Sequence, residues 1–116
     1  MSNEVSNHLG LDSPSRHNAA KQALSEEALS EYNRVIWHSR RGMLELDLVL
    51  EPFVKQAYLL LDEAIQAEYR ALLECEDQEL FDWFLRKAPA SSERYQTMVN
   101  RVLDYQAGRD LNVLIE

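Results

Sequence analysis

The sequence has few of the residues on which disulfides, metal sites and nucleotide-binding loops depend. It contains 1 cysteine, 3 histidines, 3 glycines and 3 prolines. A single cysteine excludes an internal disulfide, and together with His38, the only histidine in the patterned region, it cannot supply the several ligands of a zinc site. The glycines lie at positions 10, 42 and 108, too far apart for a phosphate-binding loop. We therefore expect neither a metal site nor a stably bound cofactor.

Positive charge is also scarce. There are 12 Lys and Arg residues against 20 Asp and Glu residues, which gives a formal net charge of −8. Nucleic-acid binding needs a clustered basic surface, so a protein partner is the better expectation. No apolar run approaches the roughly 20 residues of a membrane-spanning helix, and the N-terminus lacks the apolar core of a signal peptide. These absences predict a cytoplasmic protein that has no membrane anchor and binds no nucleic acid.

What the sequence does contain is helical periodicity. With 116 residues, 46% of them hydrophobic, the chain is long enough for one small core. Residues 1–29 are rich in Ser, Asn and Ala, and we predict a flexible N-terminal extension that is disordered or partly helical. Residues 30–108 form the predicted helical domain, and residues 109–116 a C-terminal tail. A sustained period-two alternation is missing, so a sheet is not expected.

The predicted fold is all-α, a small five-helix bundle. A first helix from Ser30 should be closed by Gly42, with Arg40 and Arg41 in its last turn. A second, kinked at Pro52, continues to about residue 61. The remaining starts and stops are Asp62 as the cap of the third helix, Asp77 as the cap and Pro89 as the stop of the fourth, Ser91 or Ser92 as the cap of the fifth, and Gly108 as its end.

The segment RRGMLELD, residues 40–47, supports two interpretations. In the first, a helix end followed by a helix start explains these residue types. In the second, the same corner is a docking site. Leu44 and Leu48 lie four residues apart and off the main apolar stripe of the second helix. Either the five-helix packing absorbs them or they offer an apolar face to a partner. The acidic run from Glu74 to Asp82 is likewise a solvated face that also caps a helix, or a contact for a basic partner.

Side chains for catalysis are poorly arranged in the sequence. Glu45 and Asp47 are two residues apart, so on a helix they point in different directions and cannot act as a carboxylate pair. Cys75 has acidic near neighbours, which disfavour a thiolate, and Ser39 beside His38 is no catalytic triad. We therefore predict that the protein is not an enzyme.

Two sequence blocks carry a resemblance to a known family. RVIWHSRRGMLELDLVLEPF, followed by LLECEDQELFDWF, is similar to the SdhE family of FAD assembly factors, also called YgfY or CptB. The resemblance covers roughly residues 33–107. The family motif R-G-x-x-E falls on Arg41, Gly42 and Glu45.

The resemblance implies a chaperone-like role in flavinylation. Family members promote covalent attachment of FAD to the flavoprotein subunit of succinate dehydrogenase and of the related fumarate reductase, so FAD is the partner's cofactor. The implied partner-binding residues are Arg41, Gly42, Glu45, Arg40, His38, Met43 and Asp47. Two alternatives of other classes are an antitoxin-like regulator and a generic helical protein-interaction adaptor.

Overall fold

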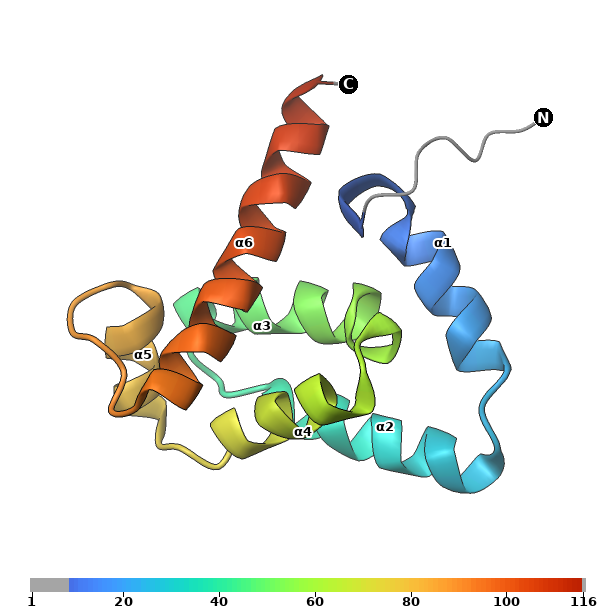
Figure 1. Ribbon diagram of the computed structural model, residues 1–116, viewed down its shortest axis with the longest axis horizontal. Coiled ribbons are helices and arrows are strands. Elements are labelled where there is room, and N and C mark those ends of the chain that lie inside the picture. Colours follow the sequence, from blue (N-terminus) through green and yellow to red (C-terminus); the bar gives the residue numbers. More distant parts are fainter. Residues whose placement is uncertain (1–8, 116) are drawn as a thin grey trace.

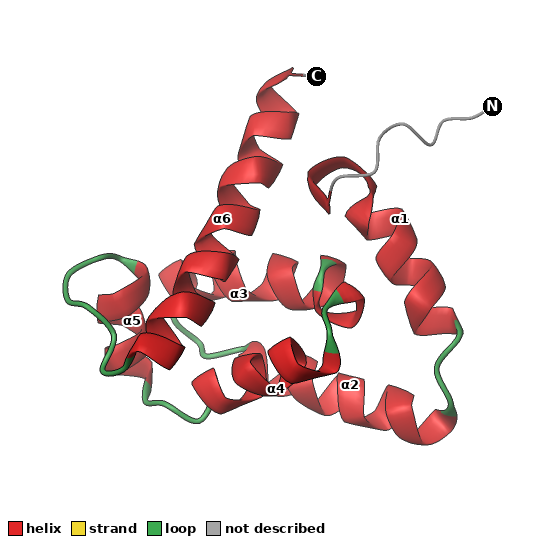
Figure 2. Cartoon of the chain, viewed as in Figure 1, coloured by secondary structure: helices red, strands yellow, loops and turns green. Residues whose placement is uncertain are grey.

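A computed structural model describes the backbone of residues 9–115 and the side chains of residues 15–108. Within these residues the regular elements are all helices joined by turns and loops, with no strand, so the predicted all-α class is confirmed (Figures 1 and 2). The elements are α1 (Leu9–Gln22), α2 (Glu26–Ser39), α3 (Leu44–Gln56), the 3-10 turn η1 (Tyr58–Leu60), α4 (Glu63–Leu72), α5 (Asp77–Phe84) and α6 (Glu93–Ile115).

Helix α3 is the centre of the core. It lies across the middle of the molecule and packs against α2, α5 and α6 (Figure 1). Leu46, Leu50 and Phe53, spaced at the steps of one helical face, are almost completely buried. Burial of each such side chain stabilises the fold by about 2 kcal/mol, and together they hold α3 in place.

Buried hydroxyl groups link α2 to the rest of the bundle. The Tyr32 hydroxyl donates to the Val54 carbonyl at 2.7 Å, across from α2 to α3. Ser39 Oγ donates to the Val35 carbonyl at 2.9 Å and lies 2.7 Å from the Tyr69 hydroxyl of α4. Burial raises the pKa of Tyr69 well above its usual value, so this hydroxyl stays protonated. The last residue of α2 is therefore fixed against α4.

The N-terminal region is partly helical, one of the two states predicted for it. From Leu9 onward it is helical, and α1 packs on η1, α3 and α6. Helix α2 begins at Glu26, four residues before the predicted start, because Ser25 Oγ accepts a hydrogen bond from the Ala28 amide at 3.1 Å. The sequence signal for α1 was weak because its apolar residues follow no clear helical stripe. Residues 1–8 lie outside the described part.

Two helix ends also differ from the predictions. The kinked helix expected to reach about residue 61 ends at Gln56, and η1 then turns the chain toward α1. The fifth predicted helix, now α6, is capped as expected by Ser92 Oγ, which accepts from the Tyr95 amide at 3.2 Å. It does not stop at Gly108 but continues to Ile115, since one helical glycine costs only about 1 kcal/mol. None of the described helices has the length and apolar character needed to cross a membrane.

Candidate docking corner

The turn between α2 and α3, residues 40–43, forms the corner. Arg40 has an extended backbone, and Gly42 has a φ of +79°, the left-handed conformation that favours glycine. The sequence predicted both arginines in the last helical turn and Gly42 as the closing residue. Helix α2 instead ends at Ser39, whose side chain is bonded to the preceding turn and to α4, and Gly42 turns the connection that follows. A Cβ atom at Gly42 would meet nothing within 4 Å, so the backbone is open there.

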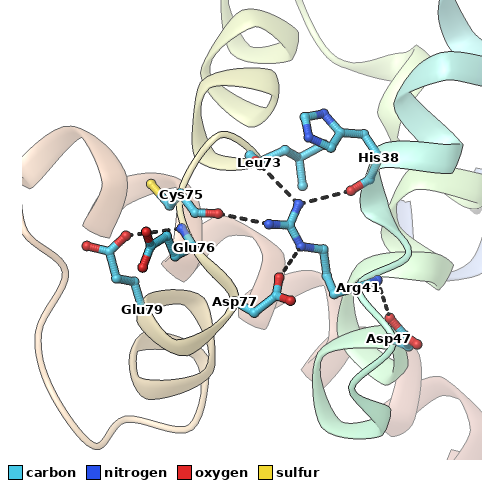
Figure 3. A network of polar contacts seen from close by, with 8 residues as sticks. All are labelled: His38, Arg41, Asp47, Leu73, Cys75, Glu76, Asp77 and Glu79. Atoms are coloured by element: carbon cyan, nitrogen blue, oxygen red, sulfur yellow. Dashed lines mark hydrogen bonds and ion pairs between the residues drawn. The ribbon is translucent and has the colours of Figure 1, made fainter.

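Arg41 points into the protein rather than into solvent. Its Nε donates to Asp77 Oδ1 at 2.7 Å, its Nη1 to the His38 and Leu73 carbonyls at 3.0 Å each, and its Nη2 to the Cys75 carbonyl at 2.8 Å (Figure 3). Only 11% of the side chain is exposed. The two sequence blocks that carry the family resemblance therefore meet at this guanidinium group.

Acidic side chains complete the network on both sides of Arg41. Asp47 Oδ1 accepts from the Arg41 amide at 2.9 Å, which ties the first turn of α3 back to the corner. Glu79 Oε1 accepts from the amide of Glu76 at 3.1 Å, and Glu76, not the predicted Asp77, is the N-cap of α5. Asp77 is not the cap, and its carboxylate instead forms an ion pair with Arg41. Part of the acidic run thus has an internal role that the sequence did not predict.

The other predicted docking residues lie on or near the surface of the corner. Glu45 and the His38 side chain are exposed, and Met43 is partly buried against the core. The Arg40 guanidinium lies over the Trp37 ring at 5.9 Å and makes a loose ion pair with Glu51 at 3.5 Å. The structure thus brings the seven predicted residues into one region, with Arg41 and Asp47 facing inward.

Three large apolar side chains beside the corner are exposed. Trp37 is 73% exposed, Leu44 69% and Leu48 56%. Trp37 lies in the last turn of α2, and the two leucines are one turn apart at the start of α3. We call these three residues the apolar group. The bundle does not absorb Leu44 and Leu48, so of the two alternatives the structure favours an apolar face available to a partner.

The corner offers binding groups rather than reactive ones. Burial is the main reason that the pKa of the Cys75 thiol is raised, and nearby Glu79 and Glu74 raise it further, so a thiolate is disfavoured. The Asp47 carboxylate accepts a hydrogen bond from the Arg41 amide and so has a structural role in the corner. Among residues whose side chains are described, no three His, Cys, Asp or Glu residues gather closely enough to hold a metal ion.

An open hollow of about 530 Å³ lies elsewhere, between α3 and α6. Its lining includes Phe53 and Leu61 on one side and Arg101 and Asp104 on the other. It shares no residue with the corner. The corner therefore remains the candidate functional site.

Comparison with known proteins gives a family match over more than half of the chain. The model of a protein family described as "Flavinator of succinate dehydrogenase" matches residues 33–106. This range contains the corner, the apolar group and the α4–α5 connection. It begins inside α2, so α1 lies outside it.

Relatives of the chain carry a consistent name. A protein of Pseudomonas savastanoi called FAD assembly factor SdhE is 50% identical over 74 residues, which are 64% of this chain and 88% of that protein. A protein of the same name from Pseudomonas aeruginosa is 49% identical over 75 residues, covering 65% of this chain and 89% of its own. The Idiomarina loihiensis protein of that name is 46% identical over 79 residues, covering 68% and 88%.

Proposed function

Because this chain belongs to the family of succinate dehydrogenase flavinators, we propose that it is an FAD assembly factor that binds the flavoprotein subunit of succinate dehydrogenase. Binding promotes covalent attachment of FAD to that subunit, and the related fumarate reductase subunit is a second client. The family match over residues 33–106, which includes every residue of the corner, is the observation that carries this proposal.

Physical features of the corner support a docking role. Gly42 has no side chain and faces open space, so a partner can approach its backbone closely. Exposed leucines of the apolar group can each contribute roughly 1.5–3 kcal/mol when a partner covers them. Glu45, exposed on the first turn of α3, can form charge-assisted hydrogen bonds at the rim of such a contact.

The proposed mechanism is stabilisation of a partner conformation. The corner supplies no activated nucleophile, so the groups that form the bond to the flavin belong to the flavoprotein. Binding shifts the flavoprotein toward the conformation in which FAD becomes covalently attached to it, and FAD stays with that subunit. In this mechanism the factor holds no cofactor of its own.

Loss of the gene tests the proposal directly. Cells that lack this protein should show little or no covalent flavin fluorescence at the succinate dehydrogenase flavoprotein on a denaturing gel, and the wild-type gene should restore it. A band of normal intensity in the deletion strain would overturn the proposal and leave the antitoxin-like regulator and the generic adaptor. Co-purification of the tagged protein from its native cells then separates those two by the partner recovered.

A further inference from the structure

We propose that Arg41 is a positioning residue, which holds the α4–α5 connection (residues 73–76) against the corner so that both meet the flavoprotein as one rigid surface. This inference rests on the proposed function. It assigns Arg41 a different role from Glu45 and Gly42, although the three residues belong to one motif.

The hydrogen bonds that Arg41 donates within the chain support this inference. A guanidinium group has five N–H donors. Four of them are used within the chain, on Asp77 and on the carbonyls of His38, Leu73 and Cys75. With one donor left and 11% of the side chain exposed, little of Arg41 remains for a partner.

The acceptors show what Arg41 holds together. The His38 carbonyl belongs to the last turn of α2, and the Leu73 and Cys75 carbonyls follow the end of α4. Carbonyl groups at helix C-termini lack partners within their own helix and favour a cation. Asp77 is the first residue of α5. One guanidinium group therefore joins the ends of α2 and α4 to the start of α5 (Figure 3).

The consequence for docking concerns conformational entropy. The α4–α5 connection has no regular structure between Leu73 and Glu76, and its Glu74 side chain is exposed beside the corner network. Without Arg41 the connection and the corner would each have to be ordered when a partner binds, which weakens binding without loss of any direct contact. A lysine could not replace Arg41, because its three donors lack the planar fork that meets four acceptors.

Two conservative variants and their combination test the proposal. Arg41→Lys and Asp77→Asn should each weaken binding to the purified flavoprotein subunit about tenfold, and the double variant should be little worse than either single one. In the free protein, both single variants should accelerate amide hydrogen exchange at residues 73–77. Arg34→Lys is the matched control, because Arg34 forms an exposed ion pair with Glu31 at 2.9 Å and should change neither measurement.

Each alternative gives a different result. If Arg41 contacted the partner directly, Arg41→Lys would weaken binding while Asp77→Asn and the exchange rates stayed as in wild type, and the proposal would be rejected. If the hydrogen bonds of Arg41 served stability alone, both variants would have lower melting temperatures but would bind the flavoprotein normally while folded. That result would also reject the proposal. Failure of the wild-type protein to bind the flavoprotein would instead reject the proposed function, and with it the partner half of this inference.

Discussion

Gly42 combines a left-handed backbone conformation with an open surface, and these two properties have separable consequences. Its φ of +79° is unfavourable for residues with a Cβ atom, by roughly 1–2 kcal/mol. A side chain there would nevertheless meet no internal neighbour within 4 Å. Substitution therefore affects stability through the backbone and affects docking through the volume added outside.

Gly42→Arg should abolish binding to the flavoprotein, with a melting temperature lower by several degrees. Gly42→Asn is the control, since asparagine tolerates the left-handed region and adds little volume. It should melt near wild type and retain most of the binding. Calorimetry and a binding titration should be run on the same samples. Normal binding by folded Gly42→Arg would show that the corner does not face the partner.

The buried side chain of His17 attaches helix α1 to the rest of the bundle. His17 is 2% exposed, and its Nε2 accepts a hydrogen bond from the Leu59 amide of η1 at 3.0 Å. The ring also packs beside Tyr32 of α2, with 5.6 Å between the ring centroids. Burial, helped by the charge of Lys21, lowers the pKa of His17 from 6.5 to about 4. A proton on Nε2 would remove the acceptor that Leu59 needs.

The depressed pKa of His17 predicts an acid-sensitive attachment of α1. Between pH 6.5 and about 4 the unfolded chain binds a proton at this position and the folded chain does not. The free energy of unfolding should therefore be fully retained above pH 6.5 and fall by up to about 3 kcal/mol toward pH 4.

Urea unfolding across this pH range measures the effect. His17→Gln is the control, because its side-chain oxygen can accept from the Leu59 amide but does not titrate. Carboxylate groups contribute equally in both proteins. The wild type should lose more stability than the glutamine variant as the pH falls, and parallel profiles would contradict this account of His17.

At the scale of the whole molecule, three exposed large apolar side chains of an acidic chain lie around the docking corner. The net charge of −8 favours solubility, whereas exposure of Trp37, Leu44 and Leu48 lowers the solubility. Such residues contribute little to the stability of the free protein, because the bundle does not cover them. Their contribution is expected only when a partner covers them.

The double variant Leu44→Ser, Leu48→Ser should therefore separate binding from folding. Its melting temperature should stay within a few degrees of wild type, and its affinity for the flavoprotein should fall by at least about tenfold. Leu85→Ser, on an exposed leucine at the end of α5, is the control and should bind as wild type. Unchanged affinity of the double variant would place the interface elsewhere.

Several features of this fold follow from local sequence alone. The helical class and the chain reversal at Gly42, which has a positive φ, follow from spacing and residue type. These features depend on contacts between residues that are close together in the sequence, and the spacing of apolar residues predicts such contacts directly. The start of α2 was missed by four residues because Ser25 was not recognised as its cap.

The seven proposed docking residues could be named from the family resemblance, but their roles could not be distinguished in this way. Arg41 and Glu45 belong to the same motif, yet one faces inward and the other outward. The inward orientation depends on carbonyls more than thirty residues away in the chain. The residues of the motif do not predict where those carbonyl groups lie in the folded chain.

The sequence by itself determined the helical class, the turn at Gly42 and the family, because these depend on local residue types and their order. The tertiary structure decided that Arg41 joins three helix ends, that His17 is buried and that Leu44 and Leu48 are not. These outcomes depend on which distant segments come together. Burial and hydrogen-bond partners are properties of the packed chain, so only the folded molecule could assign them.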